Sequence, residues 1–117
     1  MAGLEGLKKR QEFQRVYAQG WKVVGRYVAV FALVRDCGGS RLGITATRKL
    51  GGAVVRNRCR RRIREMVQKL RETLVVRGWD VVVNVRSGCE NAPWLALQED
   101  FLQCMRRVER RMQRDSL

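Results

Sequence analysis

The alternation of apolar and polar residues predicts where the first helix and the first two strands lie. Phe13, Val16 and Tyr17 recur at helical spacing within residues 9–19, and Gly20 follows as a left-handed stop, which indicates a short amphipathic helix. Residues 27–34 are apolar throughout, as in a strand that is covered on both faces or carries a ligand on one. Residues 35–40 form a turn, and residues 41–48 return as a second, cleanly alternating strand.

The second half of the chain predicts a helix, a third strand and a final helix. Gly51 and Gly52 precede a long helix at residues 53–75, a third strand follows at residues 79–86, and a loop containing Pro93 leads to a final amphipathic helix. The order αββαβα predicts an α+β fold with an antiparallel hairpin, one further strand and packed helices. The 117 residues suffice for one domain, 1–117, and are too few for two.

The helix at residues 53–75 has one apolar stripe between two arginine flanks. A helical wheel puts Arg56, Arg60 and Arg64 on one flank beside Asn57, and Arg58, Arg62 and Lys69 on the other. The stripe that would face the core comprises Cys59, Ile63, Met66, Val67, Leu70 and Leu74.

The positive charge of this helix indicates that it binds a polyanion. The chain has 25 Lys and Arg against 11 Asp and Glu, and no acidic residue lies between Cys37 and Arg64. Like charges at this spacing repel, so a bound polyanion is the natural compensator. The start of the helix after Gly51 and Gly52 adds positive backbone donors, a ready-made phosphate site. A merely solvated basic helix is the alternative; a membrane-surface helix fits less well, because its stripe would carry large Trp and Leu residues.

Other chemistry has little support in the sequence. There is no histidine and no CxxC pair, so a zinc site is not expected, and Cys59 and Cys104 are interpreted as small core residues in a reducing compartment. The carboxylates are not paired on any element, which argues against a nuclease that works by protein alone. No apolar run reaches about 20 residues, and residues 1–10 do not resemble a secretory signal, so a cytoplasmic location is expected.

Residues 40–65 carry a family resemblance. Ser-Arg-Leu-Gly-Ile at 40–44, Arg-Lys-Leu-Gly-Gly-Ala-Val-Val at 48–55 and Arg-Asn-Arg at 56–58, followed by a basic run ending in Arg64-Glu65, resemble the signature of the bacterial ribonuclease P protein component. Residues 7–20 are similar to the opening helix of that family and residues 79–86 to its last strand. One departure is Gly52, where an asparagine would help to cap the main helix.

The resemblance implies a fold and a division of labour. The fold would be a ribosomal-protein-S5-like α+β sandwich with an unusual left-handed βαβ crossover. A separate catalytic RNA would cleave precursor tRNA with magnesium, while the protein, with no catalytic residue and no cofactor or metal of its own, binds that RNA and the 5′ leader. Neither DNA nor a membrane would be a partner.

The resemblance also assigns residues. The RNA-binding set would be Arg48, Lys49, Arg56, Asn57, Arg58, Arg60, Arg61, Arg62 and Arg64. The leader-binding cleft would be Phe13, Tyr17, Ala29, Phe31, Thr45 and Thr47, where aromatic rings beside basic residues stack the bases of a single strand. Without the resemblance, plain core packing is the simpler role for the aromatic residues.

Two other kinds of nucleic-acid-binding protein remain as alternatives. A ribosomal protein or general RNA chaperone would share the charge but lack the cleft. A DNA-reading helix would carry the mixture of Asn, Gln and small residues that base readout uses, which this helix lacks.

Overall fold

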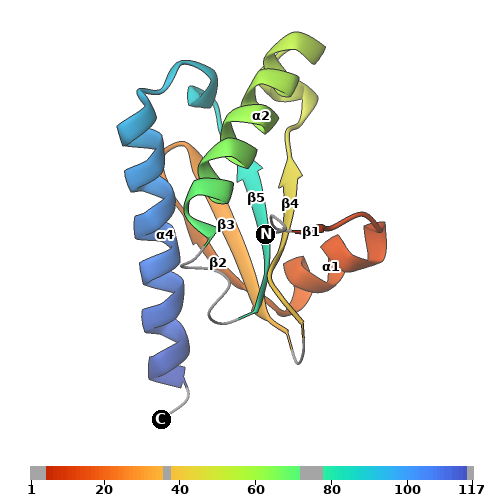
Figure 1. The fold of residues 1–117 in the computed structure, drawn as a ribbon, viewed down its shortest axis with the longest axis vertical. Coiled ribbons are helices and arrows are strands. Elements are labelled where there is room, and N and C mark those ends of the chain that lie inside the picture. Colours follow the sequence, from red (N-terminus) through yellow and green to blue (C-terminus); the bar gives the residue numbers. More distant parts are fainter. Residues whose placement is uncertain (1–4, 36–37, 72–77, 116–117) are drawn as a thin grey trace.

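The computed structural model describes residues 5–35, 38–71 and 78–115, and Figure 1 shows its ribbon. Along these ranges the strands are β1 (Glu5–Gly6), β2 (Trp21–Val24), β3 (Val28–Val34), β4 (Arg41–Thr45) and β5 (Trp79–Val85). The α-helices are α1 (Arg10–Gln19), α2 (Ala53–Lys69) and α4 (Trp94–Asp115), and two short 3-10 helices are η1 (Arg48–Leu50) and η2 (Cys89–Asn91).

The strands form one mixed sheet in the order β1-β4-β5-β3-β2. The predicted hairpin between the strands now seen as β3 and β4 is wrong, because β5 lies between them, antiparallel to β3 and parallel to β4. Trp79, Val81, Val82 and Val83 make β5 apolar on both faces, and all four are buried. A strand of this kind is stable where helices cover both faces of the sheet, as they do around β5.

Two strands were not predicted. β2 forms the actual hairpin with β3, and β1 adds a short parallel strand beside β4. β2 has only the four residues Trp-Lys-Val-Val, too few for a clear alternation, although Val23 is buried and Lys22 exposed as alternation requires. β4 ends at Thr45 rather than residue 48, because the chain turns into η1 at Arg48.

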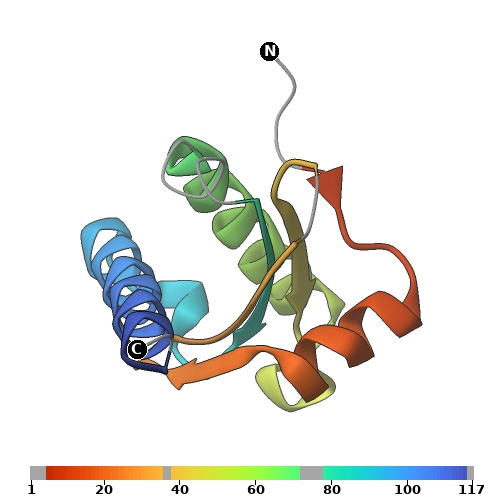
Figure 2. The ribbon, with the colours of Figure 1, turned by 90° about the horizontal axis from the view of Figure 1, so that it is seen from below.

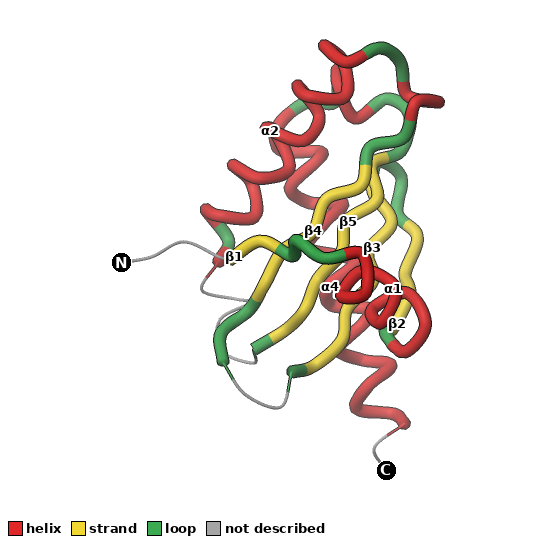
Figure 3. Tube along the Cα trace, turned by 90° about the vertical axis from the view of Figure 1, so that its right-hand side faces the viewer, coloured by secondary structure: helices red, strands yellow, loops and turns green. Residues whose placement is uncertain are grey.

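Two helical layers enclose the sheet, and in Figures 2 and 3 the sheet separates α2 from α1. On the side of α2 and α4 the main core includes Val28, Val30, Ile63, Trp79 and Phe101. On the other side α1 covers a smaller core of Leu7, Val16 and Val82, with Phe13 and Phe31 packed against it. The larger core therefore anchors the arginine helix, and α1 covers its face alone.

The connection from β4 through α2 to β5 is left-handed. In Figure 1 both strands run upward, α2 lies in front of them, and β5 lies to the left of β4. Crossovers between parallel strands are almost always right-handed, so this hand, which the family resemblance implies, is a distinctive feature of the fold.

The ends of two helices differ from prediction. Gly20 is not left-handed, since its φ is −80°; it is needed because a Cβ there would lie 2.5 Å from the carbonyl oxygen of Val16 and 2.9 Å from that of Ala32. α2 ends at Lys69 with Leu70 as its C-cap, and residues 72–75 of the predicted helix, including Leu74, lie outside the described residues. Cys59, Ile63, Met66 and Val67 of its stripe are buried, as predicted.

The cysteines behave as packing residues where they are described. Cys59, Cys89 and Cys104 are buried free thiols, which confirms the core position predicted for Cys59 and Cys104. Burial raises the pKa of Cys89 to about 12 and that of Cys104 to about 11, so both thiols stay protonated at neutral pH. Within the described ranges, no helix has the length and apolar character that crossing a bilayer requires.

Candidate nucleic-acid interface

The solvent side of α2 presents most of the predicted RNA-binding residues. Arg58, Arg61 and Arg64 are exposed together with Asn57, and η1 adds the exposed Arg48 and Lys49 at the same end of the molecule. We call these six residues the α2 basic surface. Its arginine forks can each present two parallel donors to a phosphate.

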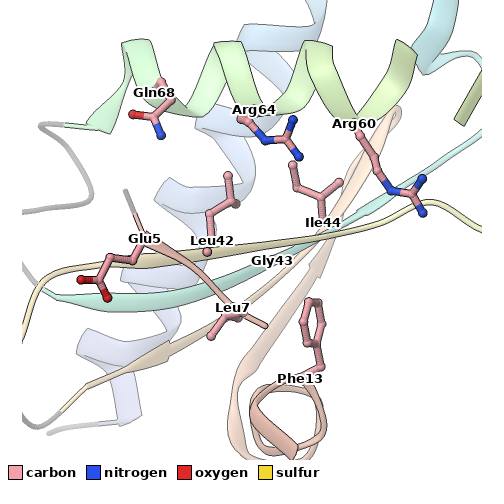
Figure 4. Close-up of a pocket in the computed structure, with 10 residues that line it drawn as sticks. Glu5, Leu7, Phe13, Leu42, Gly43, Ile44, Arg60, Arg64 and Gln68 are labelled. Atoms are coloured by element: carbon pink, nitrogen blue, oxygen red, sulfur yellow. The ribbon is translucent and has the colours of Figure 1, made fainter. Parts of the chain in front are cut away.

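One flank of α2 faces β4, the strand next to the short edge strand β1. Arg60 donates to the carbonyl oxygen of Ala46 and to Oδ1 of Asn57, each at 3.4 Å. Arg60 and Arg64 line a hollow of about 310 Å³, which passes over Leu42 and Ile44 and reaches Phe13 on the other side of the strand (Figure 4). One hollow beside β4 is therefore lined both by the arginine flank of α2 and by Phe13 of α1.

The opposite flank is partly structural. The two terminal nitrogens of Arg62 donate to the carbonyl oxygens of Cys89 and Ala92, so this guanidinium clamps η2 and the start of α4 to α2. Lys69 lies 5.1 Å above the ring of Trp94. Arg62 thus has fewer donors left for phosphate than its exposed neighbours, a role that the wheel alone did not reveal.

Several donors in the first turn of α2 lack a hydrogen-bond partner among the described residues. Gly52 is the N-cap residue and supplies no side-chain cap. Nε of Arg56 is buried, and no hydrogen-bond partner for it exists among the described residues. The backbone N–H groups of this first turn, which have no side-chain cap, are donors that an incoming phosphate could satisfy.

The face of the sheet beside α1 carries four of the six residues predicted for the leader cleft: Tyr17, Ala29, Phe31 and Thr45. Ala29, Asn84 and Thr45 stand in one row across β3, β5 and β4, because each is the register partner of the next. The hydroxyl of Tyr17 on α1 donates to Oδ1 of Asn84 at 2.9 Å and lies 3.0 Å from Oγ1 of Thr45. A hydrogen-bonded polar floor therefore lies at the edge of α1.

An aromatic pair lies next to this floor. The rings of Tyr17 and Phe31 meet edge to face with centroids 4.7 Å apart, and Nζ of Lys22 lies 5.6 Å from the centroid of Phe31. Tyr17 is exposed, and Phe31 is half-buried because one side of its ring packs against the small core, so both rings keep some surface accessible to solvent. We call Tyr17, Lys22, Phe31, Thr45 and Asn84, with Ala29 beneath them, the cleft.

Two of these residues, Asn84 and Lys22, are not among the cleft residues predicted from the sequence. Asn84 is the one polar residue in the run from Val81 to Val85, and its position in a strand buried on both faces was a signal that could have been used. Lys22 had no such signal, because β2 itself was not predicted. Both become part of the cleft only through register with β3.

The remaining predicted cleft residues have different positions. Phe13 packs under β4, where a Cβ on Gly43 would lie 2.6 Å from its ring, so it belongs to the hollow of Figure 4 and to the small core. Thr47 is exposed at the start of η1, beyond the end of β4. Ala29 is buried and contributes floor rather than a contact surface.

An ion cluster fixes α1 on the sheet. Arg41 donates from Nε and Nη2 to the two carboxylate oxygens of the buried Asp80, at 2.8 and 2.7 Å, and from Nη1 to Glu12 on α1. The hydrogen bonds to Asp80 are the main reason that the pKa of Arg41 is raised. Hydrogen bonds from the backbone N–H groups of Lys9 and Lys8, followed by the charge of Arg41, lower the pKa of Glu12 to about 2.

Comparison with known proteins agrees with this geometry. The family model for ribonuclease P matches residues 1–109. The ribonuclease P protein component of Gluconacetobacter diazotrophicus is 40% identical over 87% of this chain and 89% of its own length. That of Symbiobacterium thermophilum is 44% identical over 80% of this chain and 81% of its own length.

Solved structures give the same result. The RNase P protein of Staphylococcus aureus superposes with a TM-score of 0.74 at 30% identity, over 86% of this chain and 92% of that one. The RNase P protein of Thermotoga maritima superposes with a TM-score of 0.76 at 28% identity, over 89% and 97% of the two chains. The fold, the length of the match and the motif of α2 agree, and the chain belongs to the ribonuclease P protein family, as a protein component of the ribonuclease that processes the 5′ ends of tRNA.

Proposed function

We propose that the α2 basic surface binds the catalytic RNA of ribonuclease P, and that the cleft holds the 5′ leader of precursor tRNA. The α2 basic surface offers exposed guanidinium groups with no acidic residue interleaved, which suits a folded RNA rich in phosphate. The cleft offers aromatic rings beside a lysine and an amide, which suits the bases of a single strand. The two partners would contact different faces of one small domain.

Catalysis is assigned in this proposal to the RNA. Among the described residues no three His, Cys, Asp or Glu side chains come together to hold a metal, so the magnesium ions used in cleavage would be bound by RNA. The protein would contribute position and charge. Its arginines reduce repulsion between phosphates of substrate and catalytic RNA, so magnesium sites on the RNA fill at lower concentration. The complex would work in the cytoplasm.

One observation carries the assignment of the leader. Tyr17, Phe31 and Asn84 come from α1, β3 and β5, yet their side chains converge on one half-open face. Tyr17 is exposed and Phe31 stays half-buried although it packs against the small core, and a simple charged scaffold would not need a hydrogen-bonded row beside these rings. The arrangement favours a platform on which the bases of a single strand stack.

The experiment compares precursor and mature tRNA. Binding of both to the reconstituted holoenzyme is measured for the wild type, for Phe31→Leu, which keeps the apolar volume but removes the ring, and for Trp94→Leu, an aromatic control on the opposite layer. Loss of one stacked base, about 1–3 kcal/mol, should reduce the preference for precursor roughly 5- to 150-fold in Phe31→Leu. Trp94→Leu should retain it.

The competing outcome is equally clear. If the wild type binds precursor and mature tRNA equally well, the cleft does not hold the leader, and the chain acts as a charged scaffold or general chaperone. If Phe31→Leu and Trp94→Leu lower both affinities alike, the effect is one of stability, which a thermal melt of each variant would show.

A further inference from the structure

A second group of arginines lies on the last turns of α4. Arg107, Arg110, Arg111 and Arg114 follow one another at i, i+3, i+4 and i+7 spacing and line one shallow hollow together. We call them the α4 arginine cluster. In Figure 1 the last turns of α4 lie at the opposite end of the molecule from the first turn of α2, so this cluster is separate from the α2 basic surface.

The described side chains neutralise little of the charge of the α4 arginine cluster. None of Arg107, Arg110 and Arg114 forms an ion pair with a side chain that the structure describes. Glu109 lies on a neighbouring flank with Arg106, Arg110 and Gln113 rather than in the hollow. Four guanidinium groups on two helical turns repel one another, so the hollow favours a ligand with several negative charges.

The α4 arginine cluster is joined to the cleft through one edge strand. Nη1 of Arg111 donates to the carbonyl oxygen of Lys22 at 2.7 Å, and its guanidinium lies 5.5 Å from the ring of Trp21. The side chain of Lys22 points to the other face of β2, where it lies over Phe31. β2 is the last strand of the sheet, so no further strand blocks the way around it.

From this continuity we propose that the α4 arginine cluster binds the phosphates of the single-stranded RNA that leaves the cleft over Lys22 and passes around β2. Arg107, Arg110 and Arg114 would contact phosphate, while Arg111 holds β2 and acts as a positioning residue. The ligand class is a single strand rather than a duplex, because the path begins at stacked bases. This inference rests on the proposed function of the cleft and extends its site to longer leaders.

The test uses the holoenzyme and precursor tRNAs that differ only in leader length: a short leader that fills the cleft alone, and a long one that continues beyond it. The variant is R107Q/R110Q/R114Q, and the control with equal charge loss is K8Q/K9Q/R10Q, at the far end of α1. The α4 variant should lose about tenfold in affinity for the long leader and about 2 in log–log salt slope, at about 0.7 per phosphate contact. Its affinity for the short leader, and both affinities of the control, should stay near wild type.

The experiment distinguishes failure of this inference from failure of the proposed function of the cleft. If the wild type prefers precursor to mature tRNA but gains nothing from the longer leader, the α4 arginine cluster is not on the path, while the cleft stands. If the α4 variant loses affinity for short and long leaders alike, or for the catalytic RNA alone, the cluster contacts structured RNA and the inference is overturned. If the wild type shows no preference for any leader, the proposed function fails and this inference with it. A circular dichroism melt confirms that the variant is folded.

Discussion

At the scale of single residues, Glu12 connects three parts of the molecule. Its Oε1 accepts hydrogen bonds from the backbone N–H groups of Lys8 and Lys9, at 3.0 and 2.9 Å, and its Oε2 accepts one from Arg41 on β4. The same carboxylate therefore caps α1 and ties it to the sheet that forms the floor of the cleft. Only the ionised form can accept all of these bonds.

The stability of the domain should depend on this ionisation. The pKa of Glu12 is lowered from 4.5 to about 2, so its contribution is complete above about pH 4.5 and is lost as the pH falls toward 2. Urea midpoints measured across this range should fall less steeply for Glu12→Gln than for the wild type. Glu5→Gln, which changes an exposed carboxylate, should follow the wild type; equal slopes in all three proteins would contradict the role given to Glu12.

The residues of the cleft illustrate what sequence can and cannot predict. Tyr17, Phe31 and Thr45 were assigned through a family resemblance, and the structure brings them together. Asn84 and Lys22 were not assigned, because their place depends on register across three strands that are distant in sequence. The resemblance also assigned Phe13 to the cleft, but its ring lies against Gly43 and the small core, and helical spacing cannot say which side of α1 meets the open part of the sheet.

At the scale of elements, α4 is fastened to the sheet by Asp100. Its carboxylate accepts the backbone N–H groups of Arg26 and Tyr27 at 2.8 Å and of Val28 at 3.2 Å, in the turn between β2 and β3. This carboxylate therefore has a structural role in joining α4 to the β2–β3 turn. Its role as the cap of a distant turn has no local signal in the sequence.

Removing this carboxylate should loosen the β2–β3 hairpin. Asp100→Ala leaves backbone donors without their acceptor, which costs about 1–3 kcal/mol of unfolding free energy. The neighbouring Glu99→Ala, which removes an exposed side chain bonded to Gln103, should change it by less than about 0.5 kcal/mol. Chemical denaturation of both variants provides the measurement, and equal losses would refute the assignment.

Substitutions of two adjacent arginines of α2, Arg61 and Arg62, should have different effects: one on RNA binding and the other on the stability of the fold. Arg61 is exposed, so Arg61→Gln should weaken binding to the catalytic RNA and lower the salt slope while leaving the melting temperature unchanged. Arg62 holds the carbonyl oxygens of Cys89 and Ala92, so Arg62→Gln should destabilise the fold by about 1.5–3 kcal/mol. Filter binding and thermal melts of the same two proteins would show the contrast; similar melts would argue against the clamp.

The order of elements was largely predictable, but the neighbours of the strands were not. Periodicity located β3, β4, β5 and the faces of α2 and α4, because it depends on residues close in sequence. It could not say that β5 enters between β3 and β4, because strand neighbours depend on which edges bury most apolar surface. The apolar run of Val81, Val82 and Val83 was compatible with either position.

At the scale of the whole molecule, the net charge of +14 opposes folding. Sulfate should bind the arginine surfaces of the folded state and raise the melting temperature above that in chloride of equal ionic strength. At ten times its dissociation constant one bound anion adds about 1.4 kcal/mol. The variant R58Q/R61Q/R64Q should respond less, as calorimetry in the two salts would reveal; no difference between sulfate and chloride would exclude specific anion sites.

The central position of β5 has a consequence for synthesis. β3 and β4 each hydrogen-bond to β5 and not to one another, although both are made long before it. While the ribosome is still adding the residues before Val85, a growing chain has two strands with unsatisfied inner edges. The domain should therefore complete its sheet late in translation, and the α2 basic surface and the cleft should become rigid only after β5 has entered between β3 and β4.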